Sequence, residues 1–340
     1  MSRSSTTCVA LFAIAAAVVL SACSKKEAPP PAAPPKAAAP APVTTPVVAS
    51  PPKPVNAPAP KVELAHAFTV GELAAVALRD GGIEVPNDNK VFGVGHTPEE
   101  VAAVLSEAGQ PTDKLRLSIE PLLVKTKDKV LLFDTGAGGN FGPSAGQLAA
   151  SLAAANVDPD SITDIFISHV HGDHVGGLVN AKGALAFPNA TIHLSKPEWA
   201  YLSGMNADTA KSVGLDQHDA LLAAIKPKIA AFAPGAELVP GIVTAVEIKG
   251  HTPGHSGYLI TSGTDSLLYV GDAMHHFVIS VEKPEWPNSF DGDDKTAAAS
   301  RAALISQAAT NGQRIYAVHF PFPGIGRING RGEGFVWVAE

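Results

Sequence analysis

The sequence has little cysteine: its 340 residues contain two, Cys8 and Cys23. The main body of the chain therefore forms no internal disulfide and offers no thiolate to a metal. Any metal site there must use histidine and carboxylate side chains. Cationic stretches are also lacking. The net charge is −7 and no Lys/Arg stripe occurs, so nucleic acid is not expected as a partner.

The N-terminal segment is apolar but short. Residues 8–20 (CVALFAIAAAVVL) have the length of a signal-peptide core and are too short to span a bilayer comfortably. The tetrapeptide LSAC at residues 20–23 resembles the lipobox of bacterial lipoproteins, which are cut before a cysteine that then carries lipid. We therefore expect a signal peptide over residues 1–22 and lipidation of Cys23, with acyl chains anchoring the protein on the periplasmic side. By the same resemblance, Ser24, in place of Asp, favours the outer membrane. An ordinary secretory signal and a short membrane anchor are the alternatives.

Proline is concentrated just after this segment, where it makes up 13 of residues 27–60. Such a composition cannot form a core and favours extended polyproline II. At about 3.1 Å per residue the stretch would span up to about 100 Å. We expect a tether over residues 23–61 and a folded domain over residues 62–340.

Strand-like apolar runs alternate with helix-like segments along the rest of the chain. This interleaving predicts a layered α/β architecture. The expected strands are residues 67–78, 115–124, 130–134, 162–168, 191–194, 243–248, 258–261, 267–270, 315–318 and 335–338. The expected helices are residues 144–156, 197–202, 216–229 and 295–310.

The strongest chemical signal is the run HVHGDH at residues 169–174, directly after an apolar strand. In an extended segment, side chains two apart point the same way, so His169 and His171 can converge on one ion. Gly172 is expected to let the chain turn and bring Asp173 and His174 to the same place. The alternative, unrelated surface histidines, poorly explains four metal-competent side chains within six residues.

Three further candidate ligands follow later strands, namely His251, Asp272 and His319. The carboxyl ends of strands are where open α/β sheets build their sites. Near them, His255 is expected to support the ligands rather than to bind metal. One of His275 and His276 is expected to face the substrate.

This order of ligands resembles the metallo-β-lactamase superfamily, whose HxHxDH signature is met by residues 169–174. The later ligand positions are filled by His251, Asp272 and His319, and Asp134 matches an element that supports the site from behind the ligands. The resemblance covers roughly residues 65–340. It implies an αββα sandwich, in which two mixed sheets are flanked by helices.

The resemblance also implies two Zn²⁺ ions, with Mn²⁺, Co²⁺ or Fe²⁺ as alternatives. Asp272 would bridge the ions, and a hydroxide shared by ions about 3.5–4 Å apart would be the nucleophile. Asp173 would also orient the hydroxide and move its proton. The other ligands would divide into His169, His171 and His251 on one ion and Asp173, His174 and His319 on the second.

Short segments outside the ligands resemble the methyl parathion hydrolase-like enzymes and the lactonases and arylesterases near them. These segments are FGP at 141–143, FPNA at 187–190 and FPFPGIG at 320–326. The resemblance implies a small neutral ester, lactone or phosphotriester as the substrate. Tyr201 stands where this group carries Trp, which weighs against phosphotriesters more than against esters. The candidates for an aromatic pocket wall are Phe141, Trp199, Tyr201, Phe320 and Phe322, with ordinary core packing as the alternative for each.

Other functions stay open on the sequence alone. They are a glyoxalase-II-like thioesterase, an iron-dependent persulfide dioxygenase and a non-catalytic periplasmic metal-binding lipoprotein. Antibiotic hydrolysis is disfavoured, because the β-lactamase branches place Cys or a small residue where this chain has Asp272. The oligomeric state is also open, and since relatives of this kind often dimerise, a homodimer is one alternative.

Overall fold

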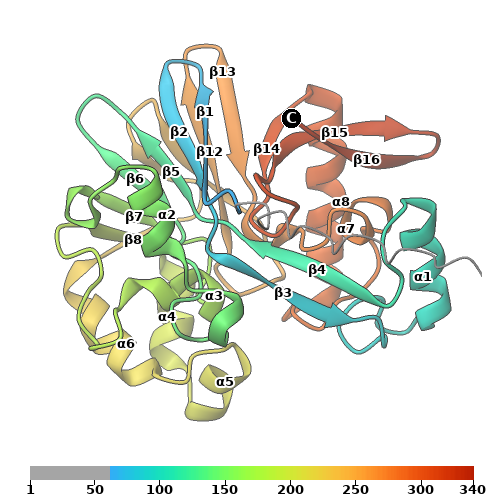
Figure 1. Ribbon diagram of the computed structural model, residues 1–340, viewed down its shortest axis with the longest axis horizontal. Helices are drawn as coiled ribbons and strands as arrows, with labels where there is room; N and C mark the ends of the chain where they lie inside the picture. The colour runs from blue at the N-terminus through green and yellow to red at the C-terminus, as the bar shows by residue number, and fades with distance from the viewer. Residues whose placement is uncertain (1–61) are drawn as a thin grey trace, which may run out of the picture. The chain divides into compact units, whose positions relative to one another are not determined.

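The computed structural model describes residues 62–340; the expected signal peptide, Cys23 and the tether lie outside these residues. The described strands form two seven-stranded sheets and one separate two-stranded sheet (Figure 1). The first sheet has the order β1-β2-β5-β6-β7-β8-β9 and the second the order β10-β11-β12-β13-β14-β15-β16. Each sheet contains both parallel and antiparallel pairs. The expected α/β class with two mixed sheets is confirmed.

The strands of the first sheet are β1 (Ala65–Val70), β2 (Leu73–Leu78), β5 (Leu122–Lys125), β6 (Val130–Phe133), β7 (Asp164–Phe166), β8 (Thr191–Ser195) and β9 (Ile229–Phe232). Those of the second are β10 (Glu237–Val239), β11 (Val243–Glu247), β12 (Ser256–Ser262), β13 (Asp265–Tyr269), β14 (Arg314–Tyr316), β15 (Ile325–Arg331) and β16 (Gly334–Ala339). The two-stranded sheet consists of β3 (Gly81–Pro86) and β4 (Lys114–Ile119).

The helices are α1 (Pro98–Glu107), α2 (Leu148–Ala154), α3 (Gly172–Val175), α4 (Lys196–Gly204), α5 (Ala207–Ser212), α6 (His218–Ile225), α7 (Ile279–Glu282) and α8 (Asp294–Asn311). Among residues 62–340, none of them is long and apolar enough to cross a membrane.

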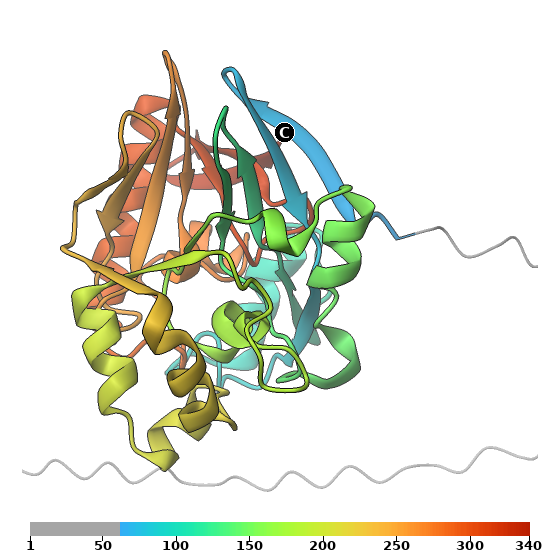
Figure 2. The ribbon, with the colours of Figure 1, turned by 90° about the vertical axis from the view of Figure 1, so that its left-hand side faces the viewer.

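Strand β6 shows how the sequence builds the layers. Its side chains alternate between the two faces of the sheet, as the two-residue period of a strand requires. Leu131 and Phe133 enter the core shared with the second sheet, where they meet Tyr258 and Tyr269. Leu132 points the other way, into the core beneath helices α2 and α4 to α6. Figure 2 shows the two sheets facing each other.

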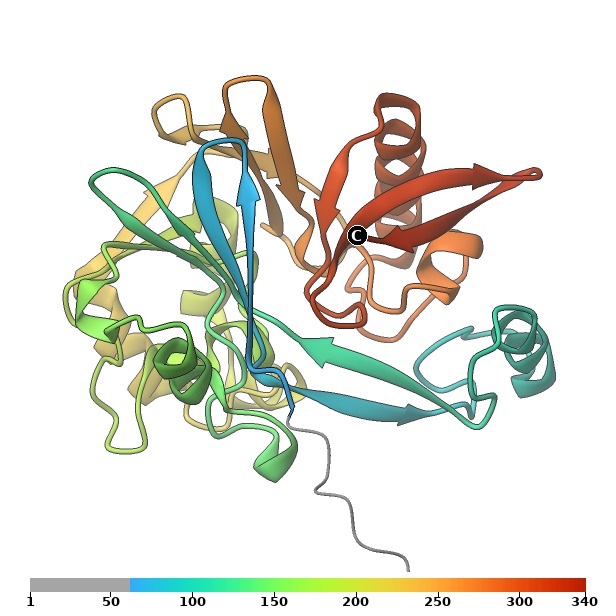
Figure 3. The same cartoon turned by 45° about the horizontal axis from the view of Figure 1, so that its top comes forward.

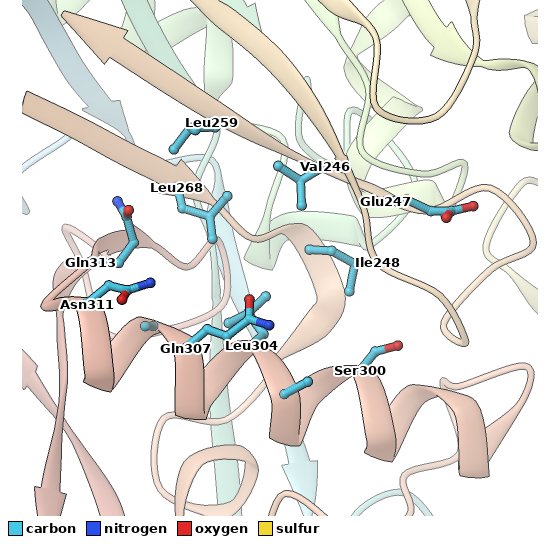
Figure 4. Close-up of a pocket in the computed structure, with 12 residues that line it drawn as sticks. Val246, Glu247, Ile248, Leu259, Leu268, Ser300, Leu304, Gln307, Asn311 and Gln313 are labelled. Atoms are coloured by element: carbon cyan, nitrogen blue, oxygen red, sulfur yellow. The ribbon is translucent and has the colours of Figure 1, made fainter. Parts of the chain in front are cut away.

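Helix α8 covers the outer face of the second sheet. Leu304, Ile305 and Ala308 pack against Val270 and Ile315. Beside this contact lies a groove of about 370 Å³ between α8 and strands β11 to β13 (Figure 4). Its floor is apolar and its rim carries the amides of Gln307, Asn311 and Gln313. This face of the sheet is therefore only partly covered.

Two runs expected as single strands are each divided in the structure. Residues 67–78 turn back at Gly71, whose φ is +54°, so that Val70 pairs with Leu73 across the β1–β2 hairpin. Residues 115–124 divide at Glu120 and Pro121 between β4 of the two-stranded sheet and β5 of the first sheet. Proline lacks an N–H and so cannot continue a hydrogen-bonded ladder.

The β3–α1–β4 segment, residues 81–119, extends from the first sheet as an arm (Figure 3). Helix α1 was not expected, although Thr97 and Glu100 form a capping box at its start. Its Val101 and Leu105 pack against Val278 and Ile279 of the α7 region. The arm thus joins the two halves of the sequence.

Glu120, at the foot of this arm, supplies a test of how burial affects stability. It is fully buried, and within residues 62–340 neither carboxyl oxygen has a hydrogen-bond partner. Burial raises the pKa of Glu120 well above 4.5. The unfolded chain therefore releases this proton first, and stability falls as pH rises from about 4.5 toward the folded-state pKa. We expect Glu120→Gln to raise the free energy of unfolding at pH 7 by about 1–3 kcal/mol.

Urea denaturation at several pH values checks this expectation. The gain in stability should shrink toward pH 4, where Glu120 of the wild type is mostly protonated in both the folded and the unfolded state. The exposed Glu107 of α1 provides the control, and Glu107→Gln should change stability by less than about 0.5 kcal/mol. A gain from Glu120→Gln that does not depend on pH would contradict the assignment.

Candidate metal centre

The seven candidate ligands lie where strands of both sheets end. His169 and His171 follow β7, and Asp173 and His174 lie within the short helix α3. His251 follows β11, Asp272 lies in the turn Gly271–Ala273 after β13, and His319 follows β14. The structure brings all seven together in two adjoining groups: His169, His171, His251 and Asp272 in one, and Asp173, His174 and His319 in the other.

In the first group, ring nitrogens approach one another closely. Nε2 of His251 lies 3.1 Å from Nε2 of His169 and 3.1 Å from Nδ1 of His171. These rings are held by other bonds. Nδ1 of His251, for example, donates to Asp291 Oδ1 at 3.0 Å. Three lone pairs that converge in this way are the donor set that a cation takes.

Asp272 faces both groups with different oxygens. Its Oδ2 lies 3.3 Å from His251 Nε2 and 3.6 Å from His169 Nε2. Its Oδ1 lies 3.2 Å from His174 Nε2 and 3.1 Å from His319 Nε2. A carboxylate directed at two sets of ligands in this way has the arrangement of a bridging ligand.

The residues fit a pair of divalent metal ions. Asp272 Oδ1 and His174 Nε2 are buried, and neither has a hydrogen-bond partner within residues 62–340. A carboxylate oxygen and an imidazole nitrogen without partners are costly unless a cation binds them. Nitrogen and oxygen donors without sulfur suit zinc, manganese, cobalt or iron.

The protonation of His169 and His171 also suits metal binding, whereas His174 sits among carboxylates that favour a positive charge, be it a proton or a cation. Burial lowers the pKa values of His169 and His171 well below 6.5, and neighbouring histidines lower them further. Both rings are therefore neutral at pH 7, which is the form that binds metal. For His174, burial acts in the same direction, but the surrounding carboxylates, led by Asp272, raise its pKa well above 6.5.

Asp134 fixes the orientation of His174. Its Oδ2 accepts from His174 Nδ1 at 2.8 Å and from the Tyr269 hydroxyl at 2.7 Å. Both of its oxygens also accept from Ser168, one from the backbone N–H and one from the hydroxyl, each at 2.7 Å. The carboxylate thus directs Nε2 of His174 toward the centre.

His255 supports Asp272. Its Nδ1 donates to the carbonyl of Ile248 at 3.1 Å, which leaves Nε2 to accept from the backbone N–H of Asp272 at 2.9 Å. Close packing requires Gly271 here, because a Cβ would lie 2.6 Å from that Nε2.

The role of Gly172 differs from the expected one. It has an ordinary φ at the start of α3, and a positive φ is not what requires glycine there. A Cβ on Gly172 would lie 2.3 Å from the carbonyl oxygen of Gly214. Close approach of two chain segments therefore explains this glycine.

Glu198 was not anticipated from the sequence, and it connects two ligand loops. Its Oε1 accepts from the N–H of Val170, between His169 and His171, at 3.0 Å. Its Oε2 accepts from Thr252 Oγ1 at 2.9 Å and from Gly254 N–H at 2.8 Å, just after His251. These partners lie 28 to 56 residues away in the chain, so no local pattern marks the residue.

Of the two adjacent histidines, His275 faces the centre. Its Nε2 lies 3.1 Å from Asp272 Oδ2, and its ring stacks on that of His319. His276 points elsewhere, where its Nδ1 accepts from backbone N–H groups at the start of α7. Phe92 of the arm and Phe290 contact His275 with ring centroids 6.2 and 5.3 Å away. Neither phenylalanine was anticipated.

The structure does not bring the predicted aromatic wall together. Phe141 is half-buried beside the ligand loop, since the neighbouring Asn140 donates to the carbonyl of Gly172. Trp199 and Tyr201 pack against the core beneath the helices of the first sheet. Phe320 must be corrected, because its ring is fully buried against Trp337.

Phe322 also packs away from the ligands. It lies against the core between the sheets, with the Arg79 guanidinium 4.1 Å from its ring centre. Trp199 and Tyr201 pack against a core that includes Val170 and Val175 of the ligand loop, so these two rings support the loop from the core side.

Comparison with known proteins agrees with this geometry. A family model described as the metallo-beta-lactamase superfamily matches residues 121–319, a span that contains all seven candidate ligands. The solved structure of AidC, a dizinc quorum-quenching lactonase, is 32% identical, with a TM-score of 0.76 over 82% of this chain and 99% of that one.

Two further proteins are similar to the chain. The hydrolase AbOPH is 26% identical, with a TM-score of 0.74 over 82% of this chain and 98% of that one. The protein YobT of Bacillus subtilis is 29% identical over 158 residues, which are 45% of this chain and 60% of YobT. The chain thus spans somewhat over half the length of that relative.

The chain belongs to the metallo-β-lactamase superfamily. Its fold and its cluster of histidines and aspartates are those of a metal-dependent hydrolase.

Replacing Glu198 tests its role in holding the ligand loops. In Glu198→Gln an amide N–H₂ replaces one acceptor oxygen, so at least one of the three donors loses its bond. We expect the free energy of unfolding of the metal-free protein to fall by about 1–3 kcal/mol, and zinc affinity to weaken. Urea denaturation and a chelator competition measure the two effects. The exposed Glu247 is the control, and equal results for Glu198→Gln and Glu247→Gln would contradict this role.

Proposed function

We propose that the protein is a dinuclear zinc hydrolase that cleaves small neutral lactones and carboxylic esters. The observation that carries the proposal is the position of Asp272, whose two oxygens face two separate groups of ligands. His169, His171 and His251 would hold one ion, and Asp173, His174 and His319 the other. Bound there, the ions would supply a hydroxide at neutral pH and would polarise the substrate carbonyl.

Charge around the site favours a neutral substrate. Within residues 62–340, Asp173 and Asp272 form ion pairs only with histidines. No lysine or arginine of this part of the chain pairs with either carboxylate. The two carboxylates would therefore repel an anionic substrate group, and no paired cation beside them would offset this repulsion. The contact of His275 with Phe92 and Phe290 makes the packing beside the ligands apolar. The 32% identity to a lactonase supports the same substrate class.

The side chains of this chain divide the remaining tasks. Asp173 is the least buried of the carboxylates in the cluster, and nearby His174 and His319 help hold its pKa low despite the cost of burial. It is therefore ionised and placed to accept a proton from the attacking group and pass it to the leaving oxygen. His275 and Phe141 border the position where the substrate would lie.

A substrate panel tests this proposal. The zinc-loaded protein should hydrolyse N-acyl homoserine lactones, dihydrocoumarin and p-nitrophenyl esters, and a chelator should abolish the activity. Paraoxon-like triesters should react more slowly. Turnover of S-lactoylglutathione alone would favour the thioesterase alternative. Oxygen uptake with a persulfide and one iron per chain would favour the dioxygenase. If the zinc-loaded protein turned over no substrate of the panel, the proposed substrate class would be wrong, and the alternative of a non-catalytic metal-binding protein would be favoured.

Asp272→Ala provides the negative control for this panel. Loss of a shared ligand should lower metal content and rate together, with the rate falling by a factor of about 100 or more. Metal analysis and initial rates measured on the same preparation check the pairing. A variant that keeps full activity would contradict the bridging role.

We further propose that the protein is lipid-anchored on the periplasmic side, most consistently at the outer membrane. The LSAC sequence before Ser24 and the proline-rich stretch that follows support this. Cys23→Ala should abolish incorporation of labelled palmitate and move the protein to the soluble periplasmic fraction. Membrane association of that variant equal to that of the wild type would overturn the anchor.

A further inference from the structure

Asp291 is a buried carboxylate just beyond the ligands, and the hydrolysis proposed above does not use it. It is the hydrogen-bond partner of His251, whose Nδ1 donates to Oδ1 at 3.0 Å. His251 Nε2 is the atom that meets His169 and His171. The carboxylate therefore sets the direction in which this ring presents its second nitrogen.

The other oxygen of Asp291 connects it to the arm. Asn288 donates from Nδ2 to Asp291 Oδ2 at 2.7 Å. The backbone of Asn288 forms an antiparallel bridge with Phe92, and the N–H of Ser289 donates to the carbonyl of Val91. Phe92 is the arm residue that contacts His275. One carboxylate thus joins a ligand to the segment that lies beside the substrate position.

Arg301 of α8 supplies the opposing charge. Its side chain is 2% exposed, and both terminal nitrogens approach Asp291 Oδ2, at 3.3 and 3.4 Å. The same guanidinium donates to the carbonyls of Pro284 and of Ala273, which directly follows Asp272. Arg301 therefore contacts both Asp291 and the turn that carries Asp272.

We propose that Asp291 is a positioning residue that selectively strengthens the first metal site, the one formed by His169, His171 and His251. It holds the Nδ1 proton of His251, so that Nε2 keeps its lone pair toward the ion, and its negative charge makes the imidazole a stronger donor. Asn288 and Arg301 fix the carboxylate in place. The docking of the arm and the occupancy of this site are then linked through one side chain.

The two sites have different supporting carboxylates, and this makes the proposal selective. Asp291 bonds His251 of the first site directly. Asp134 bonds His174 of the second site directly and reaches His169 of the first only through the Ser168 hydroxyl, which lies 3.0 Å from His169 Nδ1. In Asp291→Asn, an amide oxygen can still accept from Nδ1 while the charge is lost. We expect one of two stepwise Co²⁺ affinities to fall by about 10–100-fold, and the other to stay within a factor of about three.

Titration of the full metal-free chain with Co²⁺, followed by its visible absorption, measures both steps. Asp134→Asn should weaken the opposite step more strongly than Asp291→Asn does, because Asp134 bonds His174 directly and reaches His169 only through Ser168. The control is Asp293→Asn, because the exposed side chain of Asp293 caps α8 through Thr296, and the bond of Asp293 to the ligand loop, at Gly250, comes from its backbone N–H and is kept in the variant. Asparagine caps helices as well as aspartate does, so both affinities should be unchanged.

Wild-type affinities in Asp291→Asn, or equal weakening of both steps in that variant, would overturn the proposal. Circular dichroism establishes that each variant is folded. If Asp291→Asn does not fold, Asn288→Ala leaves both charges in place and should weaken the same single step by about threefold to tenfold. The inference rests on the proposed metal centre. The titration contains no substrate, so a failed hydrolysis screen would be a separate result.

Discussion

Crowding of Asp272 with five buried histidines is the constraint on which the rest of the structure depends. The rings that direct a nitrogen at this carboxylate, with little access to water, are His169, His174, His251, His275 and His319. Such an arrangement is costly unless cations occupy the space between the donors. The residues beyond the ligands serve to hold the donors in this position against their mutual crowding.

The rings are held in place by hydrogen bonds to the ring nitrogens that face away from the centre. Asp134 binds His174, Asp291 binds His251, and the carbonyl of Ser118 accepts from His319 Nδ1 at 2.6 Å. Glu198 adds a second kind of support, since it joins backbone segments rather than rings. The metal centre is therefore a network whose outer members come from both sheets, from the arm and from α8.

The structure brings together all seven candidate ligands named from the sequence, and they could be named because their signals are local. Four lie within six residues, and the other three each follow an apolar strand that can be recognised alone. The supporting groups had no such signal, since Glu198 and Asp291 meet their partners only after the chain has folded. The same reason explains why Phe320 was wrongly placed in the pocket, since its burial depends on Trp337 of the last strand. It also explains why Phe92 was missed, since the expectation of a single strand over residues 115–124 gave no sign of the arm.

The division of that run at Glu120 and Pro121 has a consequence for redesign of the protein. Ser118, which binds His319, lies at the base of the arm, whereas Phe92 lies in its distal part, between β3 and α1. Changes in the length or sequence of the distal arm would alter the packing around His275 while leaving the sheets and the base intact. The arm is thus the segment to vary first when the surroundings of the site are to be changed without touching a candidate ligand.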